Sequence, residues 1–132
     1  MLSKNTDLNV KAAKALLQWN SKNLTSLADL KKSEIGNFFS SDFIVEANGI
    51  KNKANHDNYF QFLNKFRENI KTIAYELEDF VVDSHHVVIP LKARIQLNDN
   101  SKQVFDAILI LGFNREHKVV LWREVYVLVE QL

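Results

Sequence analysis

The chain has 132 residues, of which 46% are hydrophobic and 25% are charged, so it suits one domain with a real core. Its 17 basic and 16 acidic residues give a net charge of +1, which argues against a basic surface for nucleic acid or anionic lipid. Cysteine is absent, and this excludes disulfides, thiolate nucleophiles and thiolate metal sites.

The amino-terminal segment, residues 1–10, contains Lys4 and Asp7 and has no apolar run, so it does not look like a signal peptide. Apolar stretches such as Ile108–Leu111 are far too short to span a bilayer. We therefore expect one cytoplasmic domain over residues 1–132 with no membrane segment and no nucleic-acid partner.

The first third of the chain is predicted to be helical, because its apolar residues recur with a period close to 3.6. The first helix is expected from Asp7 to Trp19, with Thr6 or Asp7 as its N-cap. The polar segment 20–23 interrupts it, and a second helix is predicted from Thr25 to about Phe39, either continuous or broken at Ser33 or Gly36.

The pair Asn48-Gly49 is a strong signal for a tight hairpin turn. It predicts one short strand at residues 43–47 and another at residues 50–53. The next segment, Asn55–Ile70, is predicted as a third helix, because its aromatic and leucine residues form one apolar stripe.

The second half of the chain is predicted to be strands, because runs rich in Val and Ile alternate with short polar turns. The expected strands are residues 72–82, 85–97, 102–113 and 118–129. Short turns require neighbouring strands to run antiparallel. The sequence thus predicts an α+β domain whose helices come first and pack on an antiparallel sheet.

Three segments, taken in order, resemble the nuclear transport factor 2-like (NTF2-like) superfamily, and in particular its SnoaL-like and ketosteroid-isomerase-like branch. Residues 38–46 (FFSSDFIVE) are similar to the family's helix end and first strand. Residues 52–60 (NKANHDNYF) resemble a helix start after a small residue, and residues 118–126 (KVVLWREVY) resemble the last strand. The resemblance covers about residues 8–129 and implies a cone-shaped domain with a strongly curved sheet.

Strand alternation divides the last predicted hairpin into two faces. If Phe113 and Lys118 close its turn, Leu109 pairs with Trp122. The same register pairs Ala107 with Glu124, and Phe105 with Tyr126. The family resemblance implies that this face looks toward the helices.

The hairpin before it is expected to bring two cations to the same face. A tip at residues 99–100 places Arg94 opposite Phe105 and Lys92 opposite Ala107, and Tyr75 then lies beside Lys92. A slip of one residue would reverse the faces of Arg94 and Lys92.

Glu124 is the main candidate for catalysis, because it lies between Trp122 and Tyr126 on a strand that otherwise reads as buried. A carboxylate among aromatic side chains has a raised proton affinity unless a cation is near, and a general acid or base needs this. Arg94 is the second candidate, since Arg94 or Lys92 would reach Glu124 and hold it ionised. The alternative is a structural ion pair in a partly wet cavity.

The family resemblance also identifies what this sequence lacks. Ketosteroid isomerases carry a catalytic Asp after the first strand and an oxyanion-stabilising Asp on the next-to-last strand, and the matching positions here are Ala47 and Leu109. Limonene epoxide hydrolases use an Asp-Arg-Asp network, of which Arg94 and Glu124 resemble two members, while Gln96 replaces the second acid. The resemblance therefore disfavours ketosteroid-isomerase chemistry and leaves the hydrolase network incomplete.

The expected ligand is largely apolar, because aromatic side chains dominate the predicted pocket. The sequence has no glycine-rich phosphate loop and no metal-binding spacing of histidines, so no cofactor and no metal are expected. The residues expected to contact the ligand are Trp122, Tyr126, Tyr75, Tyr59, Trp19, Lys92, Phe105 and Leu109.

The opposite face of the last hairpin is too apolar for a solvated sheet, since it carries Ile108, Ile110, Leu121, Val125 and Val127. A second copy of the chain would cover it, and the resemblance implies the same, so we expect a homodimer through the outer sheet face.

Two functions stay open at this point. The first is a small-molecule-binding pocket protein, with isomerase, cyclase or hydrolase chemistry at Glu124. The second is a non-catalytic, dimeric interaction or scaffold domain whose cavity is filled by its own aromatic side chains.

Overall fold

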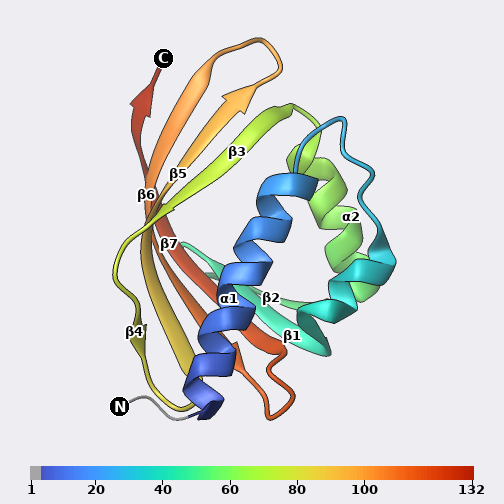
Figure 1. The fold of residues 1–132 in the computed structure, drawn as a ribbon. Helices are drawn as coiled ribbons and strands as arrows, with labels where there is room; N and C mark the ends of the chain where they lie inside the picture. The colour runs from blue at the N-terminus through green and yellow to red at the C-terminus, as the bar shows by residue number, and fades with distance from the viewer. Residues whose placement is uncertain (1–3) are drawn as a thin grey trace.

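A computed structural model describes residues 4–132. The helices α1 (Lys4–Asn23) and α2 (His56–Arg67) and the short 3-10 helix η1 (Lys32–Asn37) lie on one side of a bent sheet (Figure 1). The strands are β1 (Phe39–Ala47), β2 (Ile50–Asn55), β3 (Ile70–Leu77), β4 (Val81–Val82), β5 (His86–Leu97), β6 (Lys102–Phe113) and β7 (Val119–Gln131).

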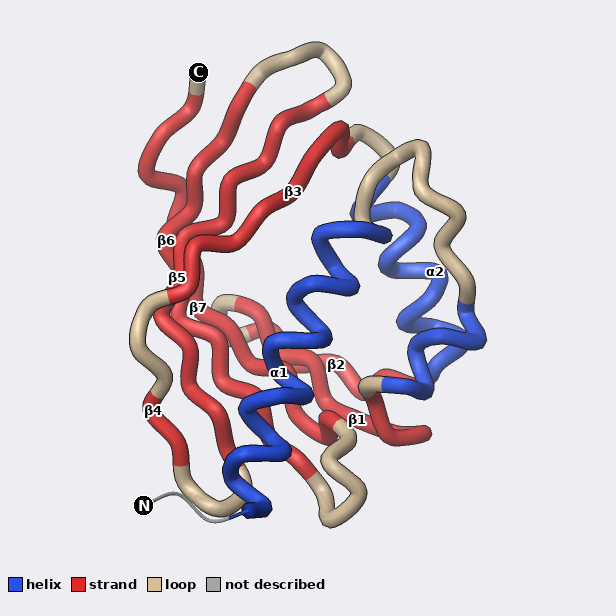
Figure 2. The backbone as a smooth tube through the Cα atoms, in the orientation of Figure 1, coloured by secondary structure: helices blue, strands red, loops and turns tan. Residues whose placement is uncertain are grey.

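The sheet has the strand order β2-β1-β7-β6-β5-β3, and β4 pairs with β5. Sequential neighbours are antiparallel as predicted, whereas β1 and β7 are far apart in the sequence and run parallel. Figure 2 shows the strands curving around the helices, so that α1 lies against the concave side. This arrangement confirms the predicted α+β, cone-shaped fold class, with a sheet that is mixed rather than wholly antiparallel.

The second predicted helix is wrong over most of its length. Residues 24–31 form a loop, only η1 is helical, and Phe39 already begins β1. The loop backbone finds its partners on another element, because Nη1 of Arg67 donates to the carbonyls of Thr25 and Ala28 at 2.9 and 2.6 Å. These tertiary hydrogen bonds replace the local ones that a helix would supply.

The predicted strand over residues 72–82 is also revised. It begins earlier, at Ile70, and is divided into β3 and β4 by residues 78–80. The Asn48-Gly49 turn is confirmed, since both residues have positive φ, 49° and 86°, as a two-residue hairpin turn of this type requires.

The core fills the space between the helices and the concave face of the sheet. Phe39 lies near its centre, with ring centroids 4.5 Å from Phe43, 4.9 Å from Tyr59 and 6.5 Å from Trp122. These contacts join β1, α2 and β7 at one point. No helix within residues 4–132 combines the length and apolar character needed to cross a membrane.

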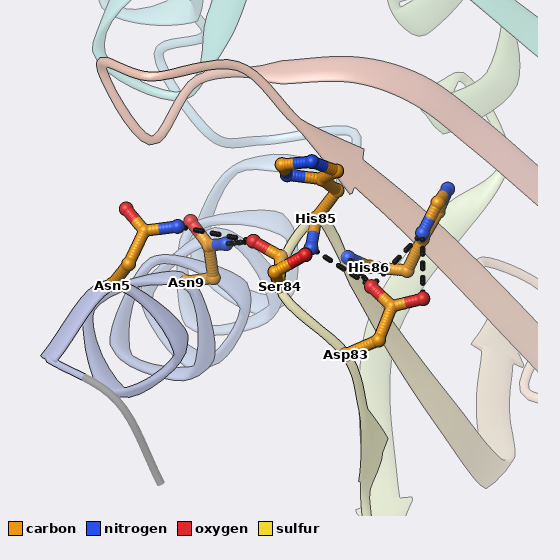
Figure 3. Close-up of polar contacts among 6 residues, drawn as sticks. All are labelled: Asn5, Asn9, Asp83, Ser84, His85 and His86. Carbon is orange, nitrogen blue, oxygen red and sulfur yellow. Dashed lines mark hydrogen bonds and ion pairs between the residues drawn. The ribbon is translucent and has the colours of Figure 1, made fainter.

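Asn9 attaches the start of α1 to two turns of the sheet. Its side chain is only 1% exposed, and its Oδ1 accepts a hydrogen bond from Nδ1 of His117 at 2.8 Å. Its Nδ2 donates to the Ser84 carbonyl at 3.5 Å, and the exposed Asn5 donates to the same oxygen at 3.0 Å (Figure 3). Asn9 is thus the buried member of a shared contact.

We expect Asn9→Ala to lower the free energy of unfolding by about 1–3 kcal/mol, because it removes a buried amide together with its hydrogen bonds to His117 and the Ser84 carbonyl. Urea unfolding followed by circular dichroism measures this loss. Asn5→Ala is the matched control, and it should cost much less because water replaces an exposed amide. If the two variants lost the same free energy of unfolding, burial would not explain the contribution of Asn9.

Candidate ligand-binding site

The last hairpin keeps its predicted faces although its register differs. Leu109 lies opposite Glu124 and Leu111 opposite Trp122, two residues from the predicted pairing. Phe113 pairs with Val119 instead of Lys118, which shifts the register by one residue. An irregularity between Gly112 and Phe113 shifts it by one more. Because side chains alternate with a period of two, this slip leaves Trp122 and Glu124 on the side of the helices.

The predicted inward direction of Arg94 and Lys92 is wrong. Strands β5 and β6 pair Arg94 with Val104 and Lys92 with Asp106, a slip of one residue that reverses the face. On the convex side, Arg94 Nε lies 2.7 Å from Glu76 Oε1, and Lys92 Nζ lies 2.6 Å from Asp106 Oδ1.

The cause of this slip is the length of the β5–β6 turn. Gln96 pairs with Lys102, so the turn is centred on Asp99 and contains an odd number of residues. Asn100 adopts a positive φ of 71°, and the Leu97 N–H donates to the Ser101 carbonyl at 2.9 Å. The predicted two-residue tip therefore does not form.

Glu124 lies half-buried on the concave side, without a cation beside it. Burial raises the pKa of its carboxyl, and the Trp122 side chain opposes this rise as a hydrogen-bond donor. Glu124 has no ion pair with any of residues 4–132. Its backbone carbonyl accepts the Asn48 N–H at 2.9 Å, which joins β7 to the end of β1.

Two tyrosines from other elements are affected by the charge of Glu124. Burial raises the pKa of both Tyr59, on α2, and Tyr75, on β3, and a negative charge on Glu124 raises both further. A hydrogen bond with the side chain of Asn20, on α1, lowers the pKa of Tyr75 in part. Both phenols therefore stay neutral at physiological pH and act as hydrogen-bonding groups.

We call Asn20, Tyr59, Tyr75 and Glu124 the inner polar cluster. Asn20 is buried and was not among the predicted site residues, because the segment 20–23 was interpreted as the end of a helix. The signal was nevertheless present, since Asn20 follows Leu16 by four residues and Ala13 by seven, on the buried face of α1.

The remaining predicted site residues divide into core and rim. The indole N–H of Trp19 donates a hydrogen bond to Glu34 Oε1 at 3.0 Å, and the ring centroids of Trp19 and Phe38 are 5.6 Å apart. Trp19 therefore connects α1 to η1. Leu109 is fully buried in the core. Phe105 and Tyr126 lie farther along the concave side and form an edge-to-face contact at 5.8 Å, with Tyr126 exposed.

Aromatic side chains also extend outward along α2 from the inner polar cluster. Tyr59 is buried, and its ring is 5.9 Å from Phe62, which in turn is 6.1 Å from Phe66. Both phenylalanines are exposed. An aromatic row therefore leads from the neighbourhood of Glu124 to the surface.

The histidine pair of the β4–β5 turn has structural contacts. Asp83 Oδ1 accepts the backbone N–H groups of His85 and His86 at 2.8 and 2.7 Å, and it lies 3.1 Å from Nδ1 of His86 (Figure 3). The Asp83 carboxylate thereby closes this turn.

No protein-family model matches the sequence, and no curated protein matches it. Solved structures with the same architecture do match. An NTF2-like protein from Anabaena variabilis is 14% identical with a TM-score of 0.76, and the match covers 96% of this chain and 95% of that one. A candidate SnoaL-like polyketide cyclase from Jannaschia is 10% identical with a TM-score of 0.75, covering 97% and 90%.

An LEH-like epoxide hydrolase from M. tuberculosis is 11% identical with a TM-score of 0.71, covering 92% of this chain and 84% of that one. At this level of identity the likeness establishes the fold. The resemblance to the NTF2-like superfamily, first recognised in three sequence segments, is therefore confirmed at the level of architecture.

Proposed function

We propose that the concave side of this NTF2-like domain binds one small, largely apolar molecule, and that the inner polar cluster supplies its polar contacts. The observation that carries the proposal is the Glu124 carboxyl, half-buried beside Trp122 and two neutral tyrosines without a paired cation. Such a carboxyl costs folding free energy, and locally unfavourable groups of this kind are expected at functional sites.

The exposed aromatic side chains support a route by which a ligand could pass from the surface to the inner polar cluster. Three aromatic side chains are exposed on elements that also carry buried aromatic residues. They are Phe62 and Phe66 on α2, and Tyr126 on β7. Exposed aromatic side chains at the edge of a concave surface are typical of a ligand-binding mouth. A ligand with an apolar body would cover them on binding.

For catalysis, we propose Glu124 as the general acid or base. Its raised pKa brings proton exchange closer to neutral pH, where a carboxyl both donates and accepts protons effectively. Isomerase, cyclase and hydrolase reactions each need such a transfer. Arg94 has no part in this step, because it is paired with Glu76 on the convex side.

The test is a thermal-shift screen with small hydrophobic compounds. We expect concentration-dependent stabilisation, amounting to about 2.7 kcal/mol when a compound is present at 100 times its Kd. Lys92→Ala, on the convex side, should respond like the parent chain, and Glu124→Gln should change the affinity for hits that carry polar groups. If no compound in a broad screen stabilises the protein, the cavity is self-filled and the proposal fails.

A second function is proposed for the convex side of the sheet, as an interface with a second copy of the chain. Ile108, Val125 and Val127 are 52%, 61% and 59% exposed there. They border a shallow groove of about 430 Å³ that also includes Lys92 and Asp106. A two-fold axis through this groove would bury the apolar centre and leave the ion pairs at its rim.

The variant Val125→Glu is expected to turn the dimer into a monomer, because it places a charge in the apolar centre of the interface. Sedimentation velocity at micromolar concentration measures the change. Leu27→Glu is the control, since Leu27 is 97% exposed in the loop before η1, and it should leave the dimer intact. A monomeric parent chain at the same concentration would disprove the interface.

A further inference from the structure

The inner polar cluster has an unbalanced charge. Among the basic side chains of residues 4–132, only Arg67, Lys92 and Lys118 are half-buried, and the other lysines and arginines are exposed. Arg67 binds loop carbonyls, Lys92 binds Asp106 on the convex side, and Lys118 Nζ donates to the Asn37 carbonyl at 2.8 Å. None of the three is directed to Glu124.

The three half-buried histidines do not supply a cation either. Nε2 of His56 lies 2.9 Å from the Ser40 carbonyl, His117 is bonded to Asn9, and His86 lies beside Asp83. The carboxyl on the concave side therefore has no partner of opposite charge from the part of the chain that the structure describes.

The side chains near Glu124 include aromatic rings of the kind that binds organic cations. Trp122 precedes it by two residues on the same face of β7, and Phe39 contacts the rings of both Trp122 and Tyr59. The charge of Glu124 also acts on Tyr59 of α2 and on Tyr75 of β3. Aromatic ring faces attract ammonium groups, most strongly where water is excluded. Since both phenols remain neutral, they add no charge of their own, and the single carboxylate supplies the counter-ion.

We infer that the ligand of this site is a small apolar amine, bound as its ammonium ion between Glu124 and the rings of Trp122, Tyr59 and Tyr75. The inference rests on the proposed function, because it requires that the concave side binds a ligand. It adds the charge of that ligand: a cation compensates the carboxylate, a neutral molecule leaves it unpaired, and an anion is repelled.

The selectivity should also depend on pH. The groups that face Glu124 are Asn20 from α1, Tyr59 from α2, Tyr75 from β3 and Ala47 from β1, none of which changes charge between pH 5 and 8. Glu124 is the one carboxyl of the inner polar cluster, and burial raises its pKa, so affinity for an ammonium ion should rise with pH as Glu124 ionises. Affinity for a neutral analogue should not rise.

Three probes with one carbon skeleton test this inference: 4-phenylbutylamine, 4-phenylbutan-1-ol and 4-phenylbutanoate. Isothermal titration calorimetry at pH 7.5 is expected to give an amine affinity at least about tenfold above that of the alcohol, and no binding of the carboxylate. Glu124→Gln should abolish the advantage of the amine while it retains the alcohol. Glu76→Gln removes a carboxylate from the convex side and should change neither value.

The outcomes separate this inference from the function on which it rests. Equal affinities of amine and alcohol, or an amine advantage that persists in Glu124→Gln, overturn the cation site and leave the apolar pocket standing. Failure of all three probes to bind the parent chain overturns both. A tenfold preference that disappears only in Glu124→Gln supports both.

Discussion

Replacing Phe39 with alanine is expected to lower the free energy of unfolding by about 3–5 kcal/mol, the range for removing a fully buried aromatic ring. Phe39 is only 2% exposed and contacts the rings of Phe43, Tyr59 and Trp122. The cavity left behind cannot collapse easily, because three different elements form its walls. Urea unfolding, followed by the fluorescence of the tryptophans, measures the loss.

Leu27→Ala is the control for this prediction. It also shortens an apolar side chain, but Leu27 is 97% exposed, so its free energy of unfolding should change by less than about 0.5 kcal/mol. Tyr59 and Trp122 border the proposed ligand, so Phe39→Ala should weaken binding as well. A loss of stability no greater than that of Leu27→Ala would show that the aromatic cluster is not the centre of the core.

Glu124→Gln is expected to stabilise the unliganded protein at pH 8. Because burial raises the pKa of Glu124 in the folded state, the folded chain binds more protons than the unfolded chain between the two pKa values. Stability therefore falls as pH rises through this window, by about 1.4 kcal/mol for each unit by which the two values differ. Glutamine keeps the shape of the side chain and cannot ionise, so the variant avoids this loss.

The measurement is the difference in unfolding free energy between Glu124→Gln and the parent chain from pH 4 to pH 8. The difference should grow with pH in the sense that favours the variant. For Glu76→Gln the difference in unfolding free energy should change with pH in the opposite sense, because contact with Arg94 lowers the pKa of Glu76. The stabilisation by this carboxylate is fully present above its unfolded pKa and is lost as pH falls through its folded pKa. A variant at Glu124 that loses stability at pH 8 would place that carboxyl in a favourable structural contact.

A stabilising Glu124→Gln would also bear on function. Functional sites are where proteins are expected to keep locally unfavourable groups. The combination of higher stability with lost selectivity for the amine would identify Glu124 as a functional residue, whereas higher stability alone would not.

Local pattern was sufficient for much of the fold and for the side of the sheet on which Glu124 lies. Alternation in the last hairpin places Trp122 and Glu124 toward the helices, and a register error of two residues leaves that result unchanged. The Asn48-Gly49 turn is equally local, since the two residues themselves favour positive φ. These features depend on neighbours in the sequence and were predicted from them.

Tertiary structure decided the rest. The faces of Arg94 and Lys92 depend on whether a turn holds an even or odd number of residues, and one extra residue reversed them. The loop before η1 is held open by Arg67 from a distant helix, which no local helical pattern reveals. The parallel pairing of β1 with β7, and the meeting of Asn20, Tyr59, Tyr75 and Glu124, join segments remote in the chain. Side-chain periodicity determines a face, but only the folded chain determines which residues share it.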